Sequence, residues 1–388
     1  MRNARRSAAV AYALILTPAL PAQETGLIVP VPPLSAVTTT AATFHAPDGS
    51  SRGFEITRPI GASSALPLVI FVNAGGPELR LARGYREWAR LVTTRGMASV
   101  LYDGPVTDAF PSIDEHLRTS LAYLDSLVAA LQRGAESFGI DPSTIVIWAG
   151  SSQTRAGTPF ALDRDRPLRV AGYVLFYGSG ELTQPRSDVP VFVARAGLDS
   201  PSLNAVLDSL TSRLMRAGAP VTIVTYPAGS HAFDLVDSTA MSARVIDQAL
   251  DFMATAADRQ LQSAIAAGVP EAEAAAAFAA EHWSEAERRY GALARSRPAS
   301  RSAAWRLGLS QLANGHPAPA LESFDRAKSL GQGGARDIGL PASRAALRAG
   351  NRARALEWMR WALSAYPRIR LEVDHDAELR PLLQEMRK

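Results

Sequence analysis

Six short, almost fully apolar segments recur between residues 66 and 226, and a helix-sized stretch separates most of them from the next. A strand with one face in water alternates apolar and polar residues, whereas a strand covered on both faces is apolar throughout. Helices on both faces of a mostly parallel sheet give a doubly wound α/β domain. We therefore predict such a domain over residues 41–258. The predicted strands are 66–73, 97–103, 145–150, 170–178, 189–197 and 221–226.

Two of the separating stretches have helical spacing. Residues 78–96 read as one helix, and residues 115–133 place five apolar side chains on one face. Such a stripe is typical of a helix that packs on a sheet. The five are Leu117, Leu121, Leu124, Val128 and Leu131.

From residue 259 onward the composition changes, because strand-like runs stop and alanine and arginine dominate. A small and a bulky residue four apart recur at intervals of 34 and 35 residues, which resembles tetratricopeptide repeats. We predict an all-α helical-repeat domain over residues 259–388. A non-repeating helical bundle is the alternative. The recurring pairs are Ala286 and Tyr290, Ala320 and Phe324, and Ala355 and Met359, with Trp305, Leu307 and Gly308 opening the second unit.

The first 22 residues have the pattern of a secretory signal peptide. Arg2, Arg5 and Arg6 precede a short apolar run, and Ala22 offers a small residue for cleavage. We expect an exported protein, periplasmic or secreted, with an extended linker over residues 23–40. An uncleaved membrane anchor or a misassigned start is the alternative, although the apolar run is short for a membrane span.

The charge and the cysteine content limit which binding partners and which cross-links the sequence predicts. Without the three leader arginines the chain has 38 basic and 37 acidic residues, a net charge of about +1. This net charge gives no reason to expect nucleic-acid binding. The chain has no cysteine and therefore no disulfide. Residues 281–388 carry 19 basic and 12 acidic residues, a net charge of +7. Residues 23–280 carry 19 basic and 25 acidic residues, a net charge of −6. The two regions are expected to attract and dock, or the repeats bind an acidic peptide.

Chemistry is indicated by a serine pair at the end of an apolar strand. The run IVIWAG is followed by Ser151 and Ser152, the strand 189–197 by Asp199, and the strand 221–226 by His231. A serine nucleophile needs a base and an orienting acid, and α/β-hydrolases place them in this chain order. Of the six histidines, only His231 follows the serines and lies in a loop of the α/β region. The other five are His45, His116, His282, His316 and His375.

The motif leaves the choice of serine open. The position two before and the position two after the nucleophile are usually small, since strand and helix crowd there. Strand length favours Ser151, with Ala149 and Gln153 at those positions, while the small-residue rule favours Ser152. Structural alternatives exist for each residue: Ser151 as a helix N-cap, Asp199 as the cap of a helix near residue 201, and His231 as a structural loop residue.

The segments GIDPSTIVIWAGSSQ, VFVARAGLDSPSLN and YPAGSHAFD resemble the dienelactone-hydrolase-like branch of the α/β-hydrolases. The resemblance covers roughly residues 50–255 and implies a serine hydrolase fold with Ser151, Asp199 and His231 as nucleophile, acid and base. Ala149 and Gln153 stand where the branch usually has glycines. Dienelactone hydrolases proper use a cysteine, so the resemblance does not imply their substrate.

In the α/β-hydrolase fold the oxyanion hole is made by two backbone N–H donors near the nucleophile. We expect one from Ser152 and one from the loop after the strand 66–73, at Gly75 or Ala74. Glycine in this loop lets the backbone turn an N–H inward.

The predicted function is a serine hydrolase that cleaves an ester, thioester or lactone through an acyl-enzyme, without cofactor or metal. Short segments after Ser151 and Tyr177 leave no room for a large lid, so we expect a pocket that is open or partly closed by the repeats. A small-molecule ester is the expected substrate, the repeats are a candidate surface for a protein or peptide, and no stable membrane insertion is expected. The alternative is an exported repeat-based binding module whose hydrolase domain has decayed, with Gln153 as the symptom.

Overall fold

The computed structural model describes residues 26–75, 77–106, 112–331 and 334–386. The leader-like segment 1–22 and the start of the expected linker lie outside these residues, so export remains a prediction from the sequence. Among the described helices, none is both long and apolar enough to cross a membrane.

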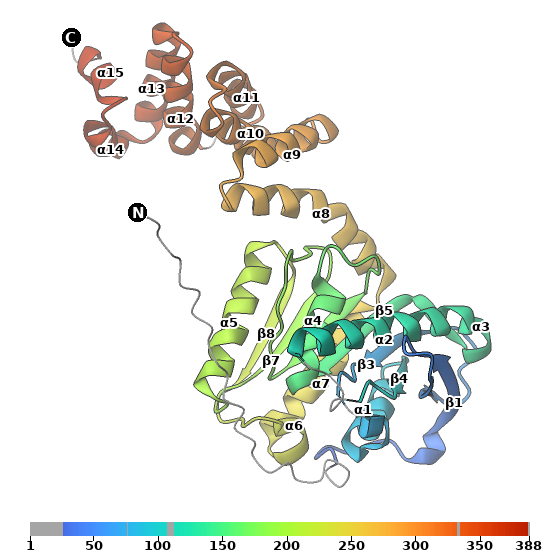
Figure 1. Ribbon diagram of the computed structural model, residues 1–388. Coiled ribbons are helices and arrows are strands. Elements are labelled where there is room, and N and C mark those ends of the chain that lie inside the picture. Colours follow the sequence, from blue (N-terminus) through green and yellow to red (C-terminus); the bar gives the residue numbers. More distant parts are fainter. Residues whose placement is uncertain (1–25, 76, 107–111, 332–333, 387–388) are drawn as a thin grey trace, which may run out of the picture.

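The core of the protein is one eight-stranded sheet in the order β1-β2-β4-β3-β5-β6-β7-β8 (Figure 1). The strand β2 is antiparallel to both neighbours, and the remaining pairs are parallel. The chain has the α/β-hydrolase fold. The strands are β1 (Val37–His45), β2 (Ser51–Pro59), β3 (Leu66–Phe71), β4 (Ala98–Tyr102), β5 (Ile140–Gly150), β6 (Gly172–Phe176), β7 (Val191–Ala196) and β8 (Val221–Tyr226).

The six apolar runs correspond to β3–β8, while the hairpin β1–β2 has no such signal. Most residues of β1 are exposed threonines and alanines, because this strand lies at the sheet edge. Val37 already pairs with Pro59, so the sheet begins four residues before the expected boundary at residue 41, and the domain division itself stays a prediction.

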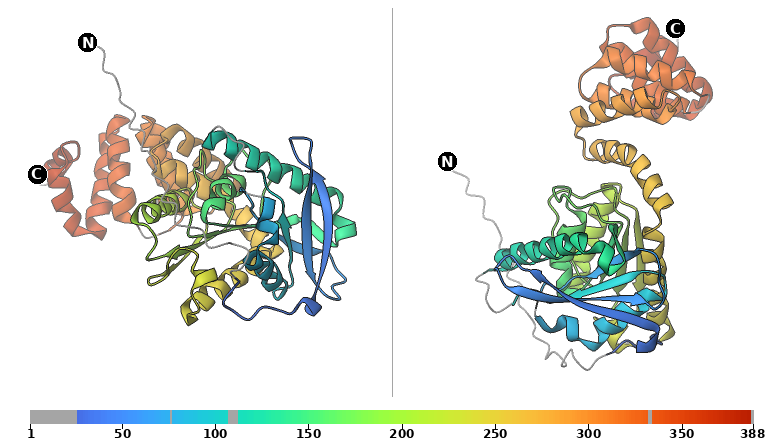
Figure 2. Two further views of the ribbon diagram at one scale, coloured as in Figure 1. Left: turned by 60° about the horizontal axis from the view of Figure 1, so that its bottom comes forward. Right: turned by 90° about the vertical axis from the view of Figure 1, so that its right-hand side faces the viewer.

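Helices cover both faces of the sheet (Figure 2). Alternate residues of β5 face opposite cores: Ile147 and Ala149 lie in the core under α2, α4 and α5, whereas Val146 and Trp148 lie in the core under α1 and α7. The expected helix 78–96 is divided into a 3-10 turn, η2 (Pro77–Leu81), and α1. The helices are α1 (Arg83–Thr93), α2 (Ile113–Arg133), α3 (Ala135–Phe138), α4 (Thr154–Leu162), α5 (Pro201–Arg216), α6 (Phe233–Val236) and α7 (Ala240–Ala256).

The helix α8 (Arg259–Ala279) attaches the C-terminal helices to the amino edge of the sheet. Arg259 pairs with Asp141 at the start of β5 at 3.1 Å, and Gln262 donates to the carbonyl of Ala171, directly before β6, at 2.7 Å. Parallel strands carry their catalytic residues at the opposite, carboxyl edge. The expectation that the repeats partly close the pocket is therefore wrong.

The helices after α8 pack each against the next and extend away from the sheet (Figures 1 and 2), so within the described residues these later helices are not docked on the α/β domain. The recurring small and bulky residues are buried in α9, α11 and α13, and a Cβ on Gly308 would lie 2.7 Å from the Phe324 ring. The assignment to tetratricopeptide repeats remains a prediction, as does the division into two domains at residue 259. The helices are α9 (Trp283–Ser296), α10 (Arg301–Ala313), α11 (Pro317–Ser329), α12 (Ala335–Arg348), α13 (Arg352–Ala365), α14 (Arg370–His375) and α15 (Arg380–Glu385).

The close approach of α4 to β5 gives a first test. A Cβ added to Gly157 would lie 2.7 Å from the Ala149 Cβ, so Gly157→Ala should overpack this contact and cost about 1–3 kcal/mol. Gly268→Ala in α8 is the matched control, because nothing lies within 4 Å of that position. Urea unfolding should show a lower midpoint for Gly157→Ala only, and equal midpoints would contradict the tight contact.

Candidate active site

A tight turn between β5 and α4 presents Ser151. The strand ends at Gly150, and Ser151 opens a 3-10 turn, η4 (Ser151–Gln153), with φ of 53°. A non-glycine residue in this left-handed region costs about 1–2 kcal/mol, so the surroundings must hold it there. This backbone marks Ser151, and not Ser152, as the residue at the apex of the turn.

Close packing holds the turn. The Thr154 hydroxyl lies 2.5 Å from the Ser151 carbonyl oxygen and accepts the Ser179 N–H at 2.9 Å. A Cβ on Gly178 would lie 2.6 Å from the same Ser151 oxygen. The small residues that the turn requires are thus Ala149, Gly157 and Gly178, and the position two after Ser151 is free to carry a long side chain.

Ser151, His231 and Asp199 form a continuous hydrogen-bonded chain. The Ser151 Oγ lies 2.7 Å from His231 Nε2, and His231 Nδ1 lies 2.7 Å from Asp199 Oδ2. A carboxylate can only accept, so Nδ1 carries the hydrogen, and in the neutral ring Nε2 then accepts the serine proton. Asp199 is 8% exposed and His231 is 40% exposed, so the base opens to solvent while the carboxylate is shielded.

The structural alternatives for these residues are not observed. The N-cap of α5 is Ser200, whose hydroxyl accepts the Leu203 N–H at 3.2 Å, while Asp199 faces His231. The helix α4 has no side-chain cap, so Ser151 does not act as one.

A buried acid lies behind His231. The Asp234 carboxylate accepts the Tyr177 hydroxyl at 2.5 Å and the Trp88 indole N–H at 2.9 Å. Burial raises the pKa of Asp234 despite these bonds. The Tyr177 ring in turn packs edge-on against His231, with centroids 4.8 Å apart. Asp234 therefore supports the ring that backs the histidine. It follows His231 by three residues, but nothing in the sequence marked it as buried.

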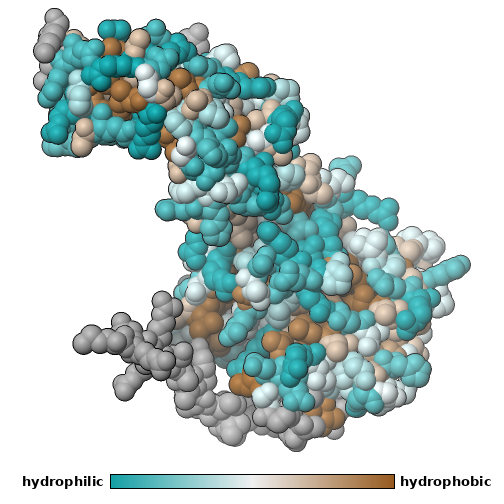
Figure 3. Space-filling model, turned by 45° about the horizontal axis from the view of Figure 1, so that its top comes forward, coloured by the Kyte–Doolittle hydropathy of each residue, from teal (hydrophilic) through white to brown (hydrophobic). Residues whose placement is uncertain are grey.

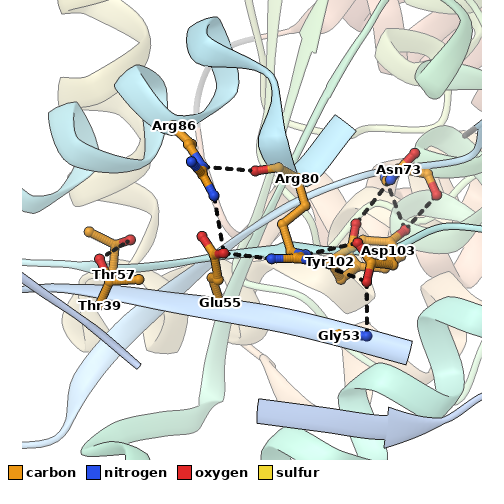
Figure 4. Close-up of polar contacts among 9 residues, drawn as sticks. All are labelled: Thr39, Gly53, Glu55, Thr57, Asn73, Arg80, Arg86, Tyr102 and Asp103. Carbon is orange, nitrogen blue, oxygen red and sulfur yellow. Dashed lines mark hydrogen bonds and ion pairs between the residues drawn. The ribbon is translucent and has the colours of Figure 1, made fainter. Parts of the chain in front are cut away.

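The loop that follows β3 is anchored by Asn73, its second residue (Figure 4). The Asn73 N–H donates to the Tyr102 hydroxyl at 2.9 Å, and the Asn73 side-chain amide donates to the Tyr102 carbonyl at 2.9 Å. Both residues are buried. Burial raises the pKa of Tyr102, which keeps its hydroxyl protonated.

Ion pairs hold the far end of this loop. Arg80 contacts Asp103 at 2.8 Å and Glu55 at 2.5 Å, and Asp103 also accepts the Gly53 N–H at 3.0 Å (Figure 4). The hydrogen bond to Asp103 is the largest cause of the raised pKa of Arg80. Asn73 is thus tied to β4, and Arg80 is tied to Glu55 of β2 and to Asp103 directly after β4.

Both candidate oxyanion donors of this loop are committed to side chains. The Ala74 N–H donates to the Gln153 Oε1 at 2.6 Å, and the Gly75 N–H donates to the Asn73 Oδ1 at 3.2 Å. The Ser152 N–H lies at the start of a helical segment, where backbone N–H groups have no partner within the helix. The sequence signalled Gln153 only as a departure from glycine and gave no indication of this contact.

No protein-family model matches the chain, and no curated protein matches it. Similar solved structures include a bacterial heroin esterase, at 16% identity, 57% coverage of this chain, 85% of that chain and a TM-score of 0.47. A fungal esterase from Rhizomucor miehei is 15% identical, with 59% of this chain and 86% of that chain covered and a TM-score of 0.48. A Klebsiella pneumoniae protein assigned as a dienelactone hydrolase is 18% identical, with 56% of this chain and 99% of that chain covered and a TM-score of 0.44. These likenesses are distant, and the fold assignment rests on the strand order.

The buried acid yields a pH test. A raised pKa means that the contribution of Asp234 to stability is fully present below its ordinary value of 3.8 and is lost as the pH rises through the folded-state pKa. Asp234→Asn cannot titrate, so its stability relative to wild type should rise as the pH increases from 4 to 7. Urea midpoints across that range measure the difference.

Asp237→Asn is the matched control for this test. The hydrogen bond from Tyr226 lowers the pKa of Asp237, so its contribution is present above the ordinary value and is lost in acid. This variant should lose stability relative to wild type only as the pH rises toward 3.8, and should stay parallel to wild type from pH 4 to 7. Identical slopes for wild type and Asp234→Asn would contradict the burial of a titrating acid.

Proposed function

We propose that the protein is a serine hydrolase that cleaves an ester, thioester or lactone. The observation that carries the proposal is the Ser151–His231–Asp199 chain, with both hydrogen bonds at 2.7 Å, at the apex of a left-handed turn. A serine, a histidine and a carboxylate in this order are the arrangement that makes a weak hydroxyl a nucleophile.

The acylation step uses each group once. The Ser151 Oγ attacks the carbonyl carbon while its proton passes to His231 Nε2, and the carbonyl π electrons move to the oxygen. Asp199 stabilises the resulting imidazolium through Nδ1–H. The oxyanion then re-forms the carbonyl and breaks the bond to the leaving group, which takes the proton from Nε2. The products are an acyl-serine and the released alcohol or thiol.

Deacylation repeats this sequence with water. His231 Nε2 takes a proton from water, the hydroxide oxygen adds to the acyl carbon, and collapse breaks the bond to the Ser151 Oγ, which regains its proton. The carboxylic acid leaves and the enzyme is restored.

The position of the site favours an accessible substrate. His231 is 40% exposed, and α8 joins the sheet at the edge away from it. We therefore propose a small or surface-presented ester as the substrate.

A fluorophosphonate probe tests the proposal and the choice of serine. Such a probe phosphonylates an activated serine with loss of fluoride, so intact mass should show one adduct on wild type and none on Ser151→Ala. Ser152→Ala is the adjacent control and should keep its adduct. Absence of labelling in folded wild-type protein would overturn the proposal, and loss of labelling in Ser152→Ala alone would move the nucleophile by one residue.

A groove of about 900 Å³ along α9–α11 favours the second candidate, a binding module. Arg288, Arg295 and Arg326 line it together with Glu287, Glu322 and Asp325, so its lining has no excess of positive charge. The visible face of the helical region is mostly hydrophilic (Figure 3). An acidic peptide, the occupant considered from the sequence, therefore gains no advantage of charge at this lining. Folded protein that binds the probe nowhere would favour this candidate.

A further inference from the structure

Gln153 lies between the nucleophile turn and the loop after β3. It is the second residue after Ser151, and its side chain is 8% exposed. Its Oε1 lies 2.6 Å from the Ala74 nitrogen, and its Nε2 lies 3.4 Å from the Ser152 Oγ. The side chain therefore fills the space between a backbone donor that an α/β-hydrolase uses for the oxyanion and the residue next to the nucleophile.

The neighbours fix which end of the amide points where. A backbone N–H can only donate, so the Ala74 N–H must face the carbonyl end of the Gln153 amide. The NH2 end then points away from Ala74, toward Ser152. The orientation follows from chemistry and not from a choice between two similar atoms.

We propose that Gln153 supplies an oxyanion donor through its Nε2–H, beside the Ser152 N–H. The Ala74 N–H acts as the anchor that holds the amide in place, and the donor is thereby moved from the backbone to a side chain. The inference rests on the proposed hydrolase function and assigns to that reaction a residue outside the triad. No bond is made or broken at Gln153, which donates a hydrogen bond to the carbonyl oxygen as negative charge develops there.

The competing arrangement is a plug, in which substrate displaces Gln153 from Ala74. Displacement breaks a 2.6 Å hydrogen bond and moves a side chain that is almost wholly buried. A donor role keeps that hydrogen bond, because the amide has a second hydrogen beyond the one near Ser152 Oγ. The Gly75 N–H cannot replace Ala74 without losing its own bond to Asn73. Preorganised donors are the ones that stabilise a transition state most.

Two substitutions in the full chain separate the alternatives. Gln153→Glu keeps an acceptor for Ala74 and removes the donor, while Gln153→Gly restores the usual small residue and frees the Ala74 N–H. If Gln153 is the donor, both variants lose about 10²–10³-fold in kcat on p-nitrophenyl acetate, with a smaller change in KM. If Gln153 is a plug, Gln153→Gly hydrolyses the ester at least as fast as wild type, and the proposal is overturned.

Gln184→Glu is the matched charge control, since Gln184 is exposed in the same α/β region. It adds the same negative charge away from the site and should leave kcat unchanged. An equal loss in this variant would mean that charge alone slows the reaction, which also overturns the proposal.

A measurement on wild-type protein covers the case in which the variants do not fold. When a phosphonate forms a tetrahedral adduct on Ser151, the Gln153 side-chain N–H proton should shift downfield in a ¹⁵N-resolved NMR spectrum. The Ala74 amide proton should stay in place. A shift of Ala74 with no change at Gln153 identifies the plug instead. Wild type that forms no adduct refutes the hydrolase function itself, whereas normal labelling with no Gln153 shift refutes this inference alone.

Discussion

The left-handed backbone of Ser151 is the constraint on which the site depends. A strand enters this residue and a helix leaves it, and the reversal is possible only because φ is 53°. The strain is about 1–2 kcal/mol, and a buried threonine hydroxyl and tightly packed glycines hold the turn against it. Those contacts direct the Oγ toward His231. The position of the serine hydroxyl is thus set by the packing beneath it as much as by the histidine beside it.

The sheet separates two kinds of surface. Its carboxyl edge gathers Ser151, Asp199 and His231 from three strands, while its amino edge carries α8 through Arg259 and Gln262. A parallel sheet makes this division available, since all chain ends of one polarity meet at one edge. The C-terminal helices can therefore vary what they contact without reshaping the chemistry, and the site stays open to solvent.

The sequence predicted the parts of the fold that are buried on both faces. Runs such as those of β3 and β5 are apolar at every position, so they stand out, whereas β1 is mostly exposed and leaves no pattern. Asp199 and His231 could be predicted as acid and base because each follows a strand and both come after the serines in the chain. The choice between Ser151 and Ser152 required the backbone dihedral. The contact between Gln153 and Ala74 joins residues 79 apart, and no local spacing encodes it.

Position 153, two residues after Ser151, does not need a glycine because strand and helix approach most closely at other positions. In the usual motif that position must be small because strand and helix meet there. Here Gly157 faces Ala149, and Gly178 faces the Ser151 carbonyl, so the smallest residues stand elsewhere on the same interface. The space left at position 153 admits a long side chain, whose carbonyl end accepts the Ala74 N–H. Once that donor is filled, the polarity of the amide is fixed. The same packing that bends the backbone at Ser151 thus leaves room for the Gln153 amide, whose NH2 end is turned away from Ala74 and toward Ser152.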